Sequence, residues 1–158
     1  MVIVLLQLRK ITESDAQLLF LWANDEDVRN NAINTHKIKW EDHINWFNKK
    51  LQSANTYMFI GFLQDEPVGQ IRFDKEDEHY IIDYSVAKIH RGKGLGTDIV
   101  KAGIKILSEA ICKPFAIAAQ VKGENIASAK VFTKLHFIKT ETVSKNNSTL
   151  SCYKLVIT

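Results

Sequence analysis

The chain has 158 residues, of which 46% are hydrophobic and 25% are charged, and its formal net charge is +3. This length predicts one domain over residues 1–158, because single domains mostly run about 100–200 residues, and the apolar share is sufficient for a hydrophobic core. Acidic and basic residues are interspersed, so the composition argues against a nucleic-acid-binding protein and is explained by an anionic small-molecule ligand.

The N-terminal half predicts one strand, two or three helices and then three more strands. The apolar run that follows Met1 is too short for a signal peptide or a membrane span, so we expect no membrane association. Thr12-Glu-Ser-Asp15 is typical of a helix cap and precedes leucines at helical spacing. Apolar residues also recur at helical spacing between Trp40 and Leu51. The strands predicted in this half are 2–11, 57–63, 68–73 and 80–86, and residues 25–30 are predicted as a short helix or turn.

The C-terminal half predicts two helices and three strands. Pro114 ends the first helix, and the apolar strand that follows it is expected to be buried on both faces. Asn146-Asn147 predicts the turn of a terminal hairpin. The order of elements predicts an α/β or mixed α+β fold. The predicted helices here are 97–111 and 128–135, and the predicted strands are 115–121, 137–144 and 150–157.

A glycine-rich turn, Arg91-Gly-Lys-Gly-Leu-Gly-Thr97, joins the strand 80–86 to the helix 97–111. Glycines leave backbone N–H groups uncovered at the start of a helix, which suits the phosphates of a nucleotide-like ligand, and Arg91 supplies a positive charge. The third glycine comes one residue too early for a dinucleotide-binding G-x-G-x-x-G, and no Gly-Lys-Ser/Thr of a Walker loop occurs. Arg-x-x-Gly-x-Gly between a strand and a helix is the pattern that remains.

That pattern resembles the pyrophosphate-binding segment of the GNAT N-acetyltransferases. The resemblance continues in Asn125-Ile-Ala-Ser128 and in the run from Lys130 to Phe137, which are similar to the family's Asn-x-x-Ser/Ala and Lys-Leu-Gly-Phe segments. It covers residues 79–137. It implies a central mixed, mostly antiparallel sheet flanked by helices, and transfer of an acetyl group from acetyl-CoA to an amine without a metal. The residues that it assigns to acetyl-CoA binding are Val86, Arg91, Gly92, Lys93, Gly94, Leu95, Gly96, Thr97, Asn125, Ser128, Phe132 and Lys134.

The resemblance also indicates which groups take part in catalysis. The backbone N–H of Val86 is the expected donor to the oxyanion. Alternation along the strand places Asp83 and Ser85 on one face, where they could orient the acceptor amine; a solvated Asp83 is the equally weighted alternative. Phe132 occupies the position where many members carry a tyrosine that protonates the leaving thiolate. Ser85 or Tyr84 could replace that donor, and a thiol pKa of about 8.5 makes the acid helpful rather than obligatory.

The N-terminal half, from Leu8 to Asn30 and from Trp40 to Phe47, resembles the acetyltransferases of the pseudaminic acid pathway. Those enzymes acetylate the 4-amino group of a UDP-linked 4-amino-4,6-dideoxy hexose. Arginine can pair with a diphosphate, tryptophan can stack on a uracil or sugar ring, and asparagine and histidine can bind hydroxyls. Core packing of Trp22, a surface position for His43 and a helix-end charge at Arg29 remain the alternatives. The expected substrate-binding residues are Trp22, Asn24, Arg29, Asn30, His43, Trp46 and Tyr84.

Two other functions remain open at this point. One is an N-acetyltransferase for a protein N-terminus or an aminoglycoside, and the other is a non-catalytic acetyl-CoA-binding module. The isolated Cys112 and Cys152 show no metal-ligand spacing and favour a reducing, cytoplasmic setting. The apolar first strand hints at a sheet edge that a second copy would cover, so a homodimer is a further expectation.

Overall fold

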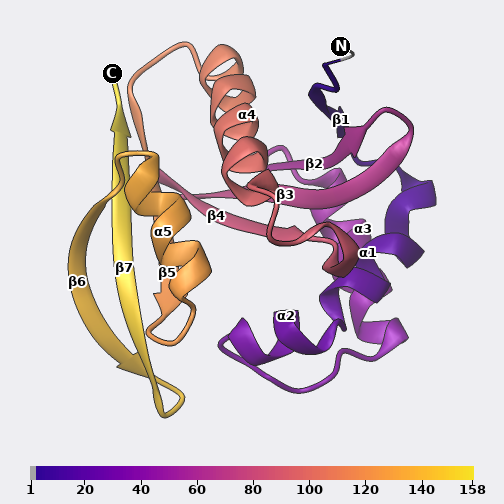
Figure 1. Cartoon of the computed structure of the whole chain (residues 1–158), viewed down its shortest axis with the longest axis horizontal. Helices are drawn as coiled ribbons and strands as arrows, with labels where there is room; N and C mark the ends of the chain where they lie inside the picture. Colours follow the sequence, from indigo (N-terminus) through magenta and orange to yellow (C-terminus); the bar gives the residue numbers. More distant parts are fainter. Residues whose placement is uncertain (1–2) are drawn as a thin grey trace.

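The computed structural model describes residues 3–158 and shows one seven-stranded mixed sheet. The strand order across the sheet is β1-β2-β3-β4-β5-β7-β6, and every neighbouring pair is antiparallel except β4 and β5. Figure 1 shows the sheet twisting strongly between its two halves. The strands are β1 (Leu6–Lys10), β2 (Thr56–Leu63), β3 (Glu66–Glu76), β4 (His79–Val86), β5 (Phe115–Lys122), β6 (Ile138–Lys145) and β7 (Ser148–Ile157).

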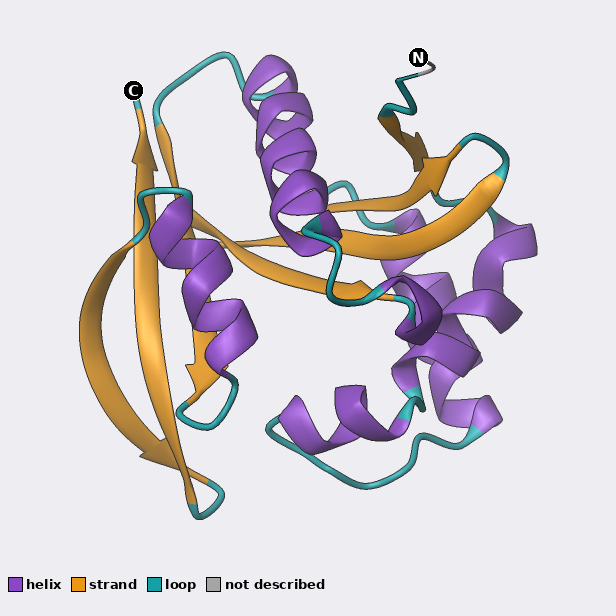
Figure 2. Ribbon diagram, viewed as in Figure 1, coloured by secondary structure: helices purple, strands orange, loops and turns teal. Residues whose placement is uncertain are grey.

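Helices cover both faces of the sheet, which confirms the predicted architecture (Figure 2). The helices α1 and α3 pack against one face, where they form a core with β2, and the helices α4 and α5 pack against the other face. Within residues 3–158, none of the helices has both the length and the apolar character needed to cross a membrane. The helices are α1 (Ala16–Ala23), α2 (Glu26–Asn31), α3 (Trp40–Gln52), α4 (Leu95–Ala110) and α5 (Ile126–Lys134), with short 3₁₀ turns at Glu13–Asp15 and Lys88–His90.

Side-chain alternation along β2 and β3 divides the two cores. Phe59, Ile71 and Phe73 are almost fully buried on the face that α4 covers. Met58 and Ile60 point the other way and pack with Phe47 of α3 in the smaller core. This two-faced burial follows from the period of two in a strand, and it leaves polar side chains of β3 and β4 next to the smaller core.

The strands β4 and β5 pair in parallel over three residues only, from His79 to Ile81 on β4 and from Ala116 to Ala118 on β5. Beyond Ile81 they diverge, as Figures 1 and 2 show. The resulting gap lies in the middle of the sheet, and α4 begins beside it. All the candidate chemistry described below is arranged around this gap.

Several predicted boundaries differ from the observed ones. The first strand is β1, Leu6–Lys10, and Val2 lies outside the described residues. The helix α4 begins at Leu95, two residues earlier than predicted, because Gly94 adopts a left-handed conformation and ends the turn there. The strand β5 is not buried on both faces, since its Gln120 is exposed. Ala116 and Ala118 are also only partly buried, so the apolar sequence of β5 overstated its burial.

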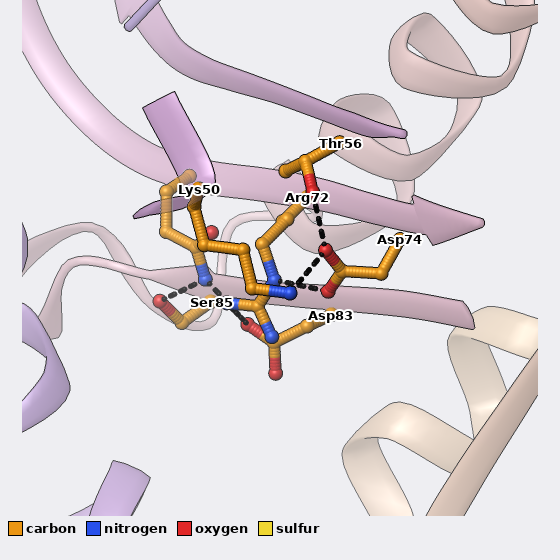
Figure 3. Close-up of polar contacts among 7 residues, drawn as sticks. Lys50, Thr56, Arg72, Asp74, Asp83 and Ser85 are labelled. Atoms are coloured by element: carbon orange, nitrogen blue, oxygen red, sulfur yellow. Dashed lines mark hydrogen bonds and ion pairs between the residues drawn. The ribbon is translucent and has the colours of Figure 1, made fainter. Parts of the chain in front are cut away.

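A network of charged side chains joins α3 to the sheet (Figure 3). The carboxylate of Asp74 accepts hydrogen bonds from Lys50 Nζ at 2.7 Å, Arg72 Nε at 2.7 Å and Thr56 Oγ1 at 2.8 Å. Burial alone would raise the pKa of Asp74, but the charge of Arg72 and these hydrogen bonds outweigh it and hold that pKa below its ordinary value. The network holds α3 against the strands that carry the candidate site.

We expect Gly69→Ala to destabilise the fold because a Cβ at this position of β3 would lie 2.5 Å from the carbonyl oxygen of Ser85. The backbone of β4 would have to move, at a cost of roughly 1–3 kcal/mol in the free energy of unfolding. Urea denaturation measures this cost. Gly123→Ala is the matched control, because its Cβ would only come within 3.8 Å of Thr149 O. Equal stability of the two variants would contradict the close β3–β4 packing.

We expect Asp74→Asn to lower the free energy of unfolding at pH 7 by roughly 1–3 kcal/mol, because charge-assisted hydrogen bonds are lost. A carboxyl whose native pKa is depressed contributes its stability above the unfolded-state pKa and loses it as the pH falls through the native pKa. The deficit of the variant should therefore shrink as the pH falls below about 4, through the depressed native pKa of Asp74. Urea titrations from pH 7 to pH 2 test this, with the exposed Asp65→Asn as control. A deficit independent of pH would show that the carboxylate charge is not what matters.

Candidate functional site

A cleft of about 910 Å³ opens where β4 and β5 diverge. Its walls come from α1 to α3 on one side and from the glycine turn, α4 and α5 on the other. The predicted site residues that line it are Trp22, Arg29, His43, Trp46, Asp83, Tyr84, Ser85, Val86, Arg91, Gly92, Gly94, Leu95, Gly96, Thr97, Asn125, Ser128 and Phe132.

Four predicted residues, all within the described part of the chain, lie outside that lining. Lys93 is exposed in the glycine turn, and Lys134 is exposed at the last position of α5. Asn24 and Asn30 also do not line the cleft. The residue types were compatible with ligand binding, but the direction of each side chain depends on turns that the sequence does not reveal.

The glycine turn presents its backbone to the cleft. Gly92 and Gly94 have φ values of +77° and +78°, and a Cβ at either would meet no atom within 4 Å. Glycine is therefore required for the backbone conformation, not for lack of space. The helix α4 starts directly after Gly94, so the first-turn N–H groups of Leu95, Gly96 and Thr97 have no partner within the helix. Together with the helix dipole they form a site suited to an anion.

Arg91 connects this turn to the opposite wall of the cleft. Its Nε donates to Val86 O at 2.9 Å, Nη2 to Asp25 at 2.8 Å and Nη1 to Asp27 at 2.8 Å. Asp25 also accepts from the N–H of Val28 and so caps α2. Burial would raise the pKa of Asp25, yet Arg91 and the backbone donors keep it below its ordinary value. Arg91 thus links α2 to the loop between β4 and α4.

The backbone of β4 directs unpaired groups into the gap. Ala87 N–H donates to Val68 O at 2.8 Å, which places the backbone groups of Ala87 on the β3 side. Successive residues of an antiparallel strand direct these groups to alternate sides, so Val86 and Tyr84 present theirs to the gap. The Val86 carbonyl meets Arg91 there. The Val86 N–H lies on the side that an oxyanion donor requires.

Asp83 and Ser85 share a face of β4 and are held by a residue of β3 that the sequence analysis missed. Gln70 Nε2 donates to Asp83 Oδ2 at 3.1 Å and to Ser85 Oγ at 3.2 Å. Arg72 Nη1 lies 3.7 Å from Asp83 Oδ2 (Figure 3). The side chain of Asp83 remains 54% exposed, so its carboxylate is open to a ligand in the cleft. The alternation of Gln70, Arg72 and Asp74 along an apolar strand was the signal for this polar face.

Tyr84 lies on the opposite face of β4, toward α4 and α5. Its hydroxyl is 2.9 Å from Ser128 Oγ, and its ring meets Phe132 edge-on with a centroid separation of 5.8 Å. Burial, as the largest cause, raises the pKa of Tyr84 above its ordinary value. Tyr84 therefore stands with the predicted acetyl-CoA residues Ser128 and Phe132, and not with Asp83 and Ser85.

The predicted substrate residues divide into structural and accessible groups. His43 is buried and its Nε2 bonds to Ala16 O at 2.8 Å, and burial lowers its pKa. Asn24 exchanges two hydrogen bonds with the backbone of Ile38. Asn30 is exposed, and its carbonyl accepts from the buried Lys122 Nζ at 2.9 Å. The side chains of His43 and Asn24 thus bond within the protein, whereas Asn30 takes part through its backbone carbonyl, and the sequence gave no sign of these roles.

Arg29, Trp46 and Trp22 remain on the wall of the cleft. Arg29 donates through Nε to Ala23 O at 2.7 Å and through Nη1 to Asn34 O and His36 O, which leaves Nη2 out of these bonds. Burial lowers the pKa of Arg29, and the nearby charge of Asp83, which acts to raise that pKa, only partly offsets the effect. The guanidinium of Arg72 lies 5.0 Å from the ring centroid of Trp46, so the two side chains form a flat layer at the α3 wall.

Comparison with known proteins agrees with this geometry. Acetyltransferase PseH of Campylobacter jejuni subsp. jejuni serotype O:23/36 (strain 81-176) is 25% identical over 136 residues, which cover 84% of this chain and 85% of that protein. Spermidine N-acetyltransferase from Vibrio cholerae, solved with CoA and spermine, superposes with a TM-score of 0.84 at 12% identity, covering 96% of this chain and 95% of that one.

A second solved structure, RimL, a ribosomal L7/L12 alpha-N-protein acetyltransferase in complex with coenzyme A, gives a TM-score of 0.82 at 17% identity, covering 99% of this chain and 97% of that one. At these identities the two solved structures establish the fold. The family model for the acetyltransferase (GNAT) domain matches residues 6–138, which include most of the chain and every residue that lines the cleft. The protein therefore belongs to the GNAT family and is an N-acetyltransferase.

Proposed function

We propose that this protein transfers the acetyl group of acetyl-CoA to the 4-amino group of a UDP-linked aminodideoxy sugar, as in pseudaminic acid biosynthesis. The observation that carries the donor half of this proposal is the gap between β4 and β5, with bare amides at one end and an open carboxylate beside it. The acceptor half rests on the resemblance of the N-terminal segments and on the 25% identity with Acetyltransferase PseH.

The residues at the gap fit coenzyme A. The turn at Gly92 and Gly94 and the first amides of α4 would hold its pyrophosphate, since they combine unpaired N–H donors with a helix dipole. The inward backbone groups of Tyr84 would pair with its pantetheine amides, as a missing strand neighbour would, while the Val86 carbonyl is bonded to Arg91 and its N–H is left for the oxyanion. Bound acetyl-CoA supplies the activated acetyl thioester.

On the acceptor side, Asp83 and Ser85 would bind the amine from the α1–α3 face. Gln70 fixes both side chains through one amide group, so the carboxylate Oδ1 is left to accept a proton or a hydrogen bond from the nitrogen. The N–H of Val86 lies on the same strand, directed into the gap. An amine held at Asp83 would therefore face the place where the acetyl carbonyl meets this donor.

The sugar nucleotide would extend from Asp83 toward α2 and α3. The ring of Trp46 backed by Arg72 offers an aromatic face for a uracil or a sugar ring. The free Nη2 of Arg29 would meet the diphosphate. The carbonyl contacts of Arg29 hold the segment 34–36 as well, so this side chain shapes the wall and contacts the ligand.

A cationic acceptor is the second candidate, and the charges of the cleft favour it. Asp27, Asp42 and Asp83 line the walls; Arg91 pairs with Asp27 and Arg72 lies 3.7 Å from Asp83, and Asp83 is still 54% exposed. A polyamine, a protein N-terminus or an aminoglycoside would be attracted by those carboxylates. The test below separates these acceptors from a UDP-sugar.

We expect Gly94→Ala to weaken acetyl-CoA binding at least about fivefold, because alanine in the left-handed region costs roughly 1 kcal/mol or more and would turn the amides away. Isothermal titration calorimetry measures the affinity. Gly123→Ala, at a glycine outside the cleft lining and without a positive φ, is the control and should bind like the parent. Undiminished affinity of Gly94→Ala would place the phosphates elsewhere.

We expect a UDP-linked 4-amino-4,6-dideoxy sugar to release thiol from acetyl-CoA with a kcat/KM at least about tenfold above that of the free aminosugar, spermidine or a peptide N-terminus. Contacts with Trp46 and Arg29 would supply this margin of about 1.4 kcal/mol. Asp83→Asn should lower kcat by about 100-fold, a usual size for loss of a general base, and Asp65→Asn should not. Preference for spermidine or the peptide would replace the sugar nucleotide by a cationic acceptor and leave the acetyltransferase assignment intact.

A further inference from the structure

We propose that the phenol of Tyr84, held by Ser128, is the acid that protonates the leaving sulfur in the acetyl transfer. This inference rests on the proposed function, because it needs coenzyme A in the gap between β4 and β5. It goes beyond it by giving a catalytic role to a side chain on the face of β4 opposite Asp83 and Ser85.

The position of Tyr84 meets the geometric requirement. Tyr84 belongs to β4 beyond Ile81, where β5 has already diverged, and its side chain lines the cleft. Its hydroxyl lies 2.9 Å from Ser128 Oγ of α5, and Ser128 also lines the cleft. The phenol therefore lies on the wall of the cleft, beside the gap in which the thioester arm would lie. The ring is held from two further sides, by Gly96 of α4 and by Phe132 of α5.

Gly96 shows how closely Tyr84 is packed against the amide turn. A Cβ at Gly96 would come within 3.3 Å of Tyr84 Cε2 and 3.8 Å of its hydroxyl oxygen. The third glycine of the turn thus makes room for this phenol beside the first amides of α4. The contacts with Gly96, Phe132 and Ser128 therefore restrict the rotation of the Tyr84 side chain.

The other side chains of the cleft are less suited to protonating the sulfur. Phe132 has no acidic proton, although it lies beside the phenol. His43 is buried with Nε2 bonded to Ala16 O, and His90 Nε2 lies 3.0 Å from Glu66 Oε1. Ser85 faces the acceptor side and is bonded to Gln70. Tyr84 combines an ionisable hydroxyl, partial burial and a position on the coenzyme side of β4.

The proton balance is complete with the groups present. As the nitrogen–carbon bond forms and the carbon–sulfur bond breaks, the electron pair of that bond goes to sulfur, and Tyr84 Oη–H gives its proton to the sulfur. The amine gives up its own proton on the opposite face, to Asp83 or water. The tyrosinate recovers a proton from solvent through the hydroxyl of the half-buried Ser128. Because burial raises the pKa of Tyr84 above its ordinary value, the phenol is protonated before the transfer begins.

The test compares two ligands and does not depend on turnover. Coenzyme A and desulfo-coenzyme A, in which hydrogen replaces the thiol, are titrated calorimetrically at pH 8.5, where about half of a free thiol is ionised. The parent should bind coenzyme A about fivefold more tightly than the desulfo analogue, as one hydrogen bond to a thiolate would give. In Tyr84→Phe that ratio should fall to about one, while desulfo-coenzyme A binds as to the parent.

Tyr57→Phe is the matched control, because Tyr57 points into the core on the same face of the sheet and lies outside the cleft lining. It should keep the parental fivefold ratio. In turnover, Tyr84→Phe should lower kcat at least about tenfold with the KM for acetyl-CoA within about twofold.

The failures are distinguishable. If the parent binds neither ligand, both the proposed acetyl-CoA site and the proposed function are contradicted. If the parent binds both and Tyr84→Phe keeps the parental ratio, Tyr84 does not touch the sulfur, and this inference is overturned while the function stands.

Discussion

The structure depends on the early separation of two parallel strands. After Ile81 the strands β4 and β5 no longer pair, so the backbone groups of Tyr84 and Val86 are left on an open side in the middle of the sheet. Unpaired backbone donors and acceptors away from water are costly, and folded proteins satisfy nearly all of them. A ligand with amides along its length can complete this ladder. The gap therefore explains both the place of the cleft and the kind of molecule that would fill it.

The two faces of β4 then divide the chemistry. Side-chain alternation directs Asp83 and Ser85 to the helices α1 to α3, and Tyr84 to α4 and α5. In the proposed reaction, one strand would serve the acceptor from one side and the donor from the other. Arg91 joins the two sides, since it holds the Val86 carbonyl at the gap and the carboxylates of α2 across the cleft. Arg91 thus connects α2 to the turn that precedes α4.

The sequence was sufficient for the fold and for placing most of the predicted acetyl-CoA residues on the wall of the cleft, because these rest on local rules. Gly92 and Gly94 mark a backbone that only glycine adopts easily, and the capping and apolar patterns located the helices to within a few residues. The acceptor half depends on long-range contacts. Gln70 reaches Asp83 through the β3–β4 register, and His43 is buried by the crossing of α1 and α3. No local pattern distinguishes such a histidine or asparagine from a ligand-binding one.

The central claim is that the unpaired edge of β4 and the first turn of α4 together hold coenzyme A. A crystal structure of the protein with coenzyme A tests it most directly. The account predicts pyrophosphate oxygens within hydrogen-bonding distance of the amides of residues 92–97, and pantetheine amides paired with the backbone of Tyr84 or Val86. Coenzyme bound outside the gap, or a gap that closes by renewed pairing of β4 with β5, would contradict it.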